Sequence, residues 1–218
     1  MSSNLLPPTA LFRFNLACRW HAQIGQLGRG ILDAGYGLPY LAQLDGAPPL
    51  VDLRVGWNNE GVQFWLSLAG KSQAPWCREN RLDDSDGLHV WLDTRDTHNI
   101  HRASRFCHHF FFMPHGAGPR LDQPLADQLL INRARENANP IRPRQLQVAA
   151  SRQERGYTLE AFIPAGALTG FDPAEYPRLG FFACVADREL GPLPLALNDE
   201  FPYDEDPSLW MSLELLRE

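Results

Sequence analysis

The stretch VDLRVGWNNEGVQFWLSL, residues Val51–Leu68, decides the fold class. Apolar and polar residues alternate in both of its halves, which is the pattern of strands with one buried face. The two halves are separated by Asn58-Asn59-Glu60-Gly61, a group of residues that favours a turn. We therefore expect a β-hairpin at this position.

Further strand-like segments follow this hairpin along the chain. Phe106–Met113 carries bulky residues on both faces, and Leu179–Asp187 is almost continuously apolar, so we expect both to be buried on two sides. A second hairpin is expected around Arg155-Gly156. The remaining strand candidates are Leu88–Asp93, Gln145–Ala150, Tyr157–Ile163 and Leu209–Leu216.

Helical patterns are scarce in this chain. Pro164–Leu168 fits a short helical turn, and Leu121–Glu136 is the only plausible longer helix, with weak periodicity. The 18 prolines and 17 glycines are spread along the whole length, as in chains with many short strands. The sequence therefore predicts an all-β fold, an antiparallel two-sheet β-sandwich of jelly-roll type with few short helices.

Length and composition limit the organisation and the partners. A chain of 218 residues fits one domain, in which we expect residues 1–45 to be an extension packed on a sandwich formed by 46–218. The net charge of −6 and the absence of a basic run argue against a nucleic-acid partner. Lys71 is the only lysine, which we interpret as a compositional bias towards arginine. Nothing in the sequence indicates an oligomeric state.

Location and thiol chemistry can also be predicted. No apolar run reaches the ~18–20 residues of a membrane span, so we expect no membrane partner. The start of the chain lacks the pattern of a signal peptide, which predicts a cytoplasmic location, or an extracytoplasmic one if a leader has been removed. The scattered cysteines form no CxxC pair, and buried free thiols are expected in preference to two disulfides; they are Cys18, Cys77, Cys107 and Cys184.

Five segments, in order, resemble the family 9 carbohydrate-binding modules and the related DOMON-type sandwiches. They span about residues 51–216 and include the hairpin, a Pro-Trp pair before an acidic strand, and a closing Trp-bearing strand. The resemblance implies a two-sheet jelly roll that binds sugars between two aromatic rings, in some members with structural calcium. The segments are Val51–Leu68, Ala74–Asp93, Gly156–Pro164 (GYTLEAFIP), Leu179–Asp187 (LGFFACVAD) and Asp206–Leu215.

The resemblance also implies positions for a sugar site. Trp76 matches one sandwiching tryptophan, and Phe201 or Tyr203 would supply the second ring. His89 stands where binding members carry a glutamate. Because arginine forks bond vicinal hydroxyls and carboxylates, the loop arginines suggest an acidic sugar. The predicted ligand-binding residues are Trp76, His89, Arg102, Arg105, His108, Asn198, Phe201 and Tyr203.

Other functions are considered beside sugar binding. The chain has no GxSxG, HExxH, GxGxxG or Walker motif, so we expect a non-catalytic domain. We expect no cofactor and interpret the acidic stretch with Asp84 and Asp86 as a turn, with a structural calcium ion there as the alternative. One alternative is a metal-assisted hydrolase that uses His89, His108 and Asp93. Another is a heme redox domain with Met113 and His108 or His109 as ligands. A third is a sandwich that has lost sugar binding and mediates protein contacts.

Overall fold

The computed structural model describes residues 7–198 and 200–217, and within them the fold is all-β. The strands are β1 (Asn15–Trp20), β2 (Val51–Asn58), β3 (Gly61–Ala69), β4 (Gly87–Asp93), β5 (Cys107–Ala117), β6 (Gln123–Leu129), β7 (Gln147–Gln153), β8 (Gly156–Pro164), β9 (Arg178–Ala186), β10 (Leu193–Pro194) and β11 (Met211–Leu216). The described helices are short 3-10 turns at Pro8–Leu11, Ala34–Tyr36, Leu41–Asp45, Leu82–Asp84, Ala165–Ala167 and Pro207–Leu209.

Both expected hairpins are present. In the β2–β3 hairpin Asn58 pairs with Gly61, and the Asn58 side chain accepts a hydrogen bond from the Glu60 N–H at 2.8 Å. In the β7–β8 hairpin Gln153 pairs with Gly156. Gly156 has φ of +153°, and a Cβ there would lie 1.8 Å from the Leu68 carbonyl oxygen of β3. Only glycine lets β8 start so close to β3.

The strands form one hydrogen-bonded path in the order β6-β5-β4-β9-β11-β1-β2-β3-β8-β7, with β10 paired to β9. Strand β1 is parallel to both of its neighbours, β11 and β2, and every other described pairing is antiparallel. β1, which belongs to the stretch 1–45 expected to pack on the sandwich, lies inside the sheet as a strand between β11 and β2. The predicted domain boundary at residue 45 stays a prediction.

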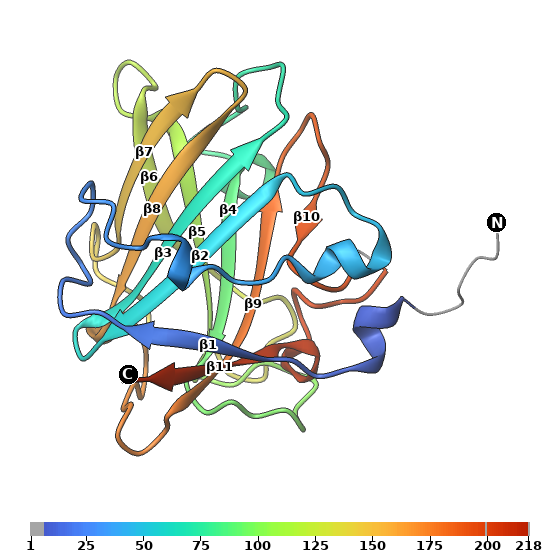
Figure 1. Ribbon diagram of the computed structural model, residues 1–218. Helices are drawn as coiled ribbons and strands as arrows, with labels where there is room; N and C mark the ends of the chain where they lie inside the picture. Colours follow the sequence, from blue (N-terminus) through green and yellow to red (C-terminus); the bar gives the residue numbers. More distant parts are fainter. Residues whose placement is uncertain (1–6, 199, 218) are drawn as a thin grey trace.

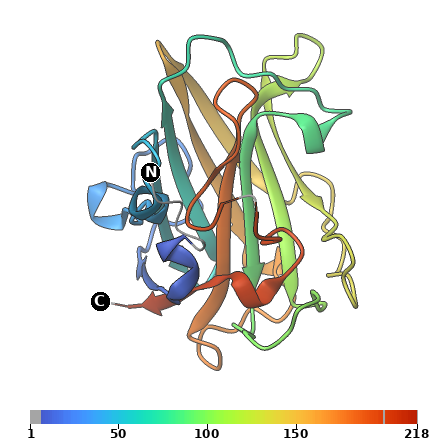
Figure 2. The same cartoon turned by 90° about the vertical axis from the view of Figure 1, so that its right-hand side faces the viewer.

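The two ends of this path come close together, so the sheet is nearly closed. β7 contacts both β5 and β6 without strand hydrogen bonds between them. β1 and β11 cross the lower part of the molecule at a steep angle to β4 and β5, and the remaining strands enclose the core (Figure 1). Seen from the side, the gold strands β7 and β8 lie behind the green and orange strands β4, β5 and β9 (Figure 2).

Two strand predictions are confirmed and the helix prediction is wrong. β5 and β9 are both buried along almost their whole length, as expected for strands covered on both faces. The proposed helix at Leu121–Glu136 contains β6 instead, which pairs with β5. The hydrogen bonds that the otherwise free edge of β5 offers outweigh the weak helical preference of this segment. All four cysteines are buried free thiols.

Candidate functional site

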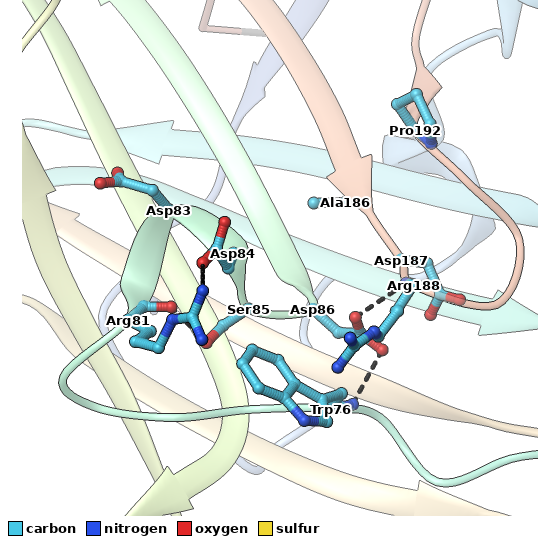
Figure 3. A pocket seen from close by; sticks show the side chains of 10 residues that line it. All are labelled: Trp76, Arg81, Asp83, Asp84, Ser85, Asp86, Ala186, Asp187, Arg188 and Pro192. Carbon is cyan, nitrogen blue, oxygen red and sulfur yellow. Dashed lines mark hydrogen bonds and ion pairs between the residues drawn. The ribbon is translucent and has the colours of Figure 1, made fainter.

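Trp76 lies at the wall of a pocket of about 360 Å³ beside the ends of β4 and β9. Its indole is partly exposed, and the polar side chains of two chain segments surround it (Figure 3). The first segment leads into β4 and the second leaves β9. The lining residues are Trp76, Arg81, Asp83, Asp84, Ser85, Asp86, Ala186, Asp187, Arg188 and Pro192.

Strand register explains why these two segments meet. β4 and β9 are antiparallel, with Gly87 opposite Ala186. Asp86 precedes Gly87 and Asp187 follows Ala186, so the two carboxylates come from neighbouring chain ends. Gly87 has no space for a side chain, because a Cβ there would lie 2.4 Å from the Phe112 carbonyl oxygen and 2.7 Å from the Phe111 ring. The close packing of β4 on β5 therefore fixes the base of the pocket.

Asp86 joins the two walls of the pocket. One carboxylate oxygen accepts the backbone N–H of Trp76 at 2.9 Å, and the other accepts the backbone N–H of Arg188 at 2.8 Å. Figure 3 shows both hydrogen bonds. The Asp86 N–H in turn donates to the Trp76 carbonyl at 2.8 Å. Asp86 is only 2% exposed, and burial raises the pKa of its carboxyl, against the two N–H donors. Asp86 thus sets the position of Trp76 relative to Arg188.

A buried lysine compensates the negative charge of the carboxylates in this region. Lys71 is 2% exposed, forms an ion pair with Asp187, and has its Nζ 3.4 Å from Asp86 Oδ2 and 3.7 Å from Glu189 Oε2. Glu189 also accepts hydrogen bonds from Ser72 and from the N–H of Gln73, which lower its pKa to about 2. Buried carboxylates need such partners because desolvation penalises the charged form.

Three arginines surround the Trp76 ring. The guanidinium carbons of Arg188, Arg78 and Arg81 lie 4.7, 5.5 and 5.7 Å from its centroid. Arg81 forms an ion pair with Asp84, and Arg78 donates to the Cys77 carbonyl. The Arg188 side chain makes no hydrogen bond or ion pair with any described residue, and the residue is exposed. Its planar donors are available to a ligand that enters the pocket.

Three predicted site residues lie outside the lining of the Trp76 pocket, one on β4 and two in the segment between β10 and β11. His89 is partly buried on β4, with Nδ1 2.9 Å from His109 Nε2 and its ring stacked on Trp91. Tyr203 is buried and stacks on Phe182 at 4.4 Å between ring centroids. Phe201 lines a different pocket, near residues 9–14 and 196–211. Neither aromatic residue is among the residues that line the Trp76 pocket.

The other predicted site residues are dispersed. His108 is fully buried on the opposite face of the sheet from His89, and it accepts the Thr169 N–H at 3.0 Å. Arg102 donates to the Arg133 carbonyl, and Arg105 lies over the ring of Phe106. Asn198 accepts the N–H of Glu200 at 3.2 Å. None of these four lines the Trp76 pocket.

The geometry gives no support to the two enzyme alternatives. The hydrolase would need His89 and His108 together, but they point to opposite faces of β4 and β5. The heme alternative would need Met113 and a histidine on opposite sides of one iron. Met113 and His109 instead face the same side of one strand, ~13 Å apart by strand rise. His109 is also in contact with His89.

The calcium candidates already have partners. Asp84 pairs with Arg81, and both Asp86 oxygens accept backbone hydrogen bonds. In residues 7–198 and 200–217, no group of three or more His, Cys, Asp or Glu is arranged to hold a metal ion. No helix among these residues is long and apolar enough to cross a membrane.

Comparisons with known proteins rest on structure alone. No protein-family profile matches the chain, and no curated protein sequence matches it. A family 9 carbohydrate binding module from Caldicellulosiruptor kristjanssonii, solved in complex with glucose, has a TM-score of 0.59 at 11% identity and covers 94% of this chain and 97% of its own. A structure of such a module from the same organism in complex with cellotriose has a TM-score of 0.57 at 11% identity, with coverage of 94% and 95%.

A third similar structure comes from Bacteroides uniformis, a protein to which carbohydrate binding has been provisionally assigned. Its TM-score is 0.59 at 12% identity, and the match covers 94% of this chain and all of the other. At such low identities the likeness establishes the fold. It agrees with the sequence resemblance to family 9 modules and leaves the DOMON part of that resemblance a prediction.

Sequence reasoning missed Asp187 and Arg188, which line the Trp76 pocket, and Lys71, which pairs with Asp187. Two signals were available. Lys71 is the only lysine in an arginine-rich chain, and a single lysine close to a Pro-Trp motif could have been tested as a specific charge partner. Asp187 and Arg188 end a strand whose pairing with β4 would have placed them beside Asp86.

Proposed function

We propose that the protein is a non-catalytic carbohydrate-binding domain and that the pocket beside Trp76 is its sugar site. The observation that carries the proposal is a partly exposed indole in the wall of a pocket whose remaining lining is mostly polar. The apolar C–H face of a sugar ring can stack on indole while its hydroxyls bond the surrounding groups. The structural neighbours solved with glucose and cellotriose support this choice of ligand class.

Donors and acceptors for sugar hydroxyls lie on both walls. Arg188 offers unpaired guanidinium N–H groups, and the exposed carboxylates of Asp83 and Asp84 offer acceptors. Only one aromatic ring is present in the pocket. One stacked ring supplies about 0.5–1.5 kcal/mol beyond area burial, so we propose weak binding of a single sugar, with a Kd of about 1 mM.

We further propose a preference for sugars that carry a carboxylate. Arg188 is the support for this proposal, because its planar fork can pair with a carboxylate in a bidentate way. The predicted arginines Arg102 and Arg105 do not line this pocket. Lys71 already balances the buried carboxylates beneath the pocket, which leaves Arg188 free to act on the ligand.

We also infer that the strand path is best described as the two-sheet jelly roll expected from the sequence. The close approach of β7 to β5 and β6 supports this description, as do the steep crossing of β1 and β11 and the likeness to family 9 modules. The location of the protein in the cell stays a prediction.

The test is a glycan array, followed by calorimetry and ligand-observed NMR with glucose and glucuronic acid. Trp76→Ala should weaken binding at least about tenfold, because it removes the stacking surface. Trp65→Ala is the matched control, since Trp65 is a partly exposed tryptophan on β3 that lies under Arg54. A folded wild-type protein that binds no glycan, or a Trp76→Ala variant with unchanged affinity, would contradict the proposal. Capture of a protein partner would then favour the protein-contact alternative.

A further inference from the structure

A second pocket, of about 380 Å³, opens where the two ends of the strand path meet. One wall comes from the β5–β6 hairpin, through Pro114, His115, Leu121 and Asp122. The opposite wall comes from the β7–β8 hairpin, through Ala150, Ser151, Arg152 and Tyr157. Ala74 and Pro75 complete the lining. The pocket follows from the nearly closed sheet, because β6 and β7 approach without hydrogen bonds that would seal the seam.

The lining combines an apolar surface with polar groups on both walls. Proline, alanine and leucine side chains supply the apolar part. His115 and Asp122 stand on one wall, with Ser151 and Arg152 on the other. The Arg152 side chain has no hydrogen bond or ion pair with the described residues, and it is exposed. Its guanidinium is therefore available as a donor to a bound molecule.

Tyr157 supplies a buried part of the lining. It is 2% exposed, and its buried hydroxyl has no hydrogen-bond partner among the described residues. Burial, together with the nearby carboxylates of Asp187 and Asp86, raises the pKa of Tyr157 well above its usual value. The polar side chains that remain for a ligand in this pocket are therefore those of His115, Asp122, Ser151 and Arg152.

We propose that this pocket is a second sugar subsite, which holds the next unit of an oligosaccharide whose first unit stacks on Trp76. This inference rests on the proposed function of the Trp76 pocket. A pyranose ring has apolar C–H faces and hydroxyls around its rim. An apolar surface flanked by polar side chains on two walls complements that shape.

Chain contiguity joins the two pockets. Pro75 lines the second pocket and Trp76 lines the first, and consecutive Cα atoms lie ~3.8 Å apart. The two pockets are thus separated only by the short segment that carries the indole, and Ala74 of this segment is exposed. A ligand that crosses the segment reaches both pockets, which a monosaccharide is too short to do.

The experiment compares glucose with cellotriose by calorimetry on the full chain. Wild type should bind cellotriose about tenfold more tightly than glucose, a gain of about 1.4 kcal/mol. Arg152→Ala removes the free donor and Ala150→Leu fills the pocket, so both should abolish the gain and leave glucose affinity unchanged. Arg155→Ala is the control, because it changes the same charge in the same hairpin without touching the pocket lining.

The outcomes separate this subsite from the Trp76 site. One outcome would overturn the second subsite alone. In it, Trp76→Ala weakens the binding of both glucose and cellotriose, whereas Arg152→Ala and Ala150→Leu leave the affinity for cellotriose unchanged. Equal affinities of wild type for glucose and cellotriose would also overturn it. If Trp76→Ala changes neither affinity, the function proposed for the first pocket fails and the second subsite falls with it.

Discussion

The carboxylate of Asp86 accepts the backbone N–H of Trp76 at 2.9 Å and thereby fixes the segment that carries the indole. Its other oxygen holds the backbone of Arg188 across the pocket, at 2.8 Å. One buried side chain therefore fixes the two backbone positions from which the indole and the free guanidinium extend.

Replacement of Asp86 should affect both stability and sugar binding. Asp86→Ala leaves two backbone N–H groups and part of the Lys71 charge unpaired in the interior, so the free energy of unfolding should fall by about 3 kcal/mol. Sugar affinity should fall about tenfold through misplacement of the ring. Asp86→Asn, which keeps one acceptor oxygen, should recover part of the lost stability and part of the lost sugar affinity. Urea denaturation and calorimetry measure the two effects. Asp83→Ala, an exposed change in the same pocket, serves as the stability control.

Lys71 should be essential for stability at neutral pH. Lys71→Met preserves the volume but leaves Asp86 and Asp187 without their cation, so we expect a loss of about 3–5 kcal/mol at pH 7. The pKa of the Asp86 carboxyl, which burial already raises, should then rise further in the folded state. Since protonation removes the uncompensated charge, the deficit relative to wild type should shrink as pH falls from 7 to 5. A deficit that is constant across this range in urea titrations would contradict the argument.

Local patterns predicted the hairpins because the sequence of each is self-contained. Asn58–Gly61 supplies its own turn, and β2 and β3 alternate in character. β6 could not be predicted in this way, since its state depends on the free edge of β5. The residues of the pocket also differ in whether a local pattern or a distant pairing places them. Trp76 was found from a local motif, whereas Arg188 is brought there by the register of β4 against β9, which no local pattern encodes.

Removal of divalent cations should leave the protein unchanged. The Lys71 ammonium already neutralises Asp86 and Asp187, and Arg81 pairs with Asp84. The melting temperature should therefore stay within about 1 °C after dialysis against EDTA and after addition of calcium, because a ligand stabilises only a state that binds it. A calcium-dependent rise in the melting temperature would instead support the alternative of a structural calcium ion at Asp84 and Asp86.

Buried histidine should make the fold sensitive to acid. Burial lowers the pKa of His108 to about 4, against about 6.5 in an unfolded chain. Between these values the unfolded state binds a proton that the folded state does not, so stability is full above pH 6.5 and falls as pH drops towards 4. The loss should approach about 3 kcal/mol for this group. Urea denaturation at several pH values should show a shallower pH dependence for His108→Gln than for wild type.

The choice between neutral and acidic sugars should depend on Arg188. Its guanidinium lies 4.7 Å from the Trp76 ring centroid and forms no ion pair with a described residue. A sugar stacked on the indole would bring its substituents to this fork. Glucuronic acid differs from glucose by a carboxylate in place of a hydroxymethyl group, so the comparison isolates the charge. Wild type should prefer glucuronic acid about fivefold, consistent with one partly exposed charge-assisted pair of about 1 kcal/mol.

Arg188→Ala should remove this preference and lower the affinity for glucose by only about threefold, since one hydroxyl donor is lost while the stacking surface remains. Arg105→Ala should leave the preference intact, because Arg105 lies over Phe106 and away from the pocket lining. The preference of wild type should also shrink as salt rises from 50 to 500 mM, because exposed charges are screened. Equal affinity of wild type for the two sugars at low salt would show that the pocket does not select for a carboxylate.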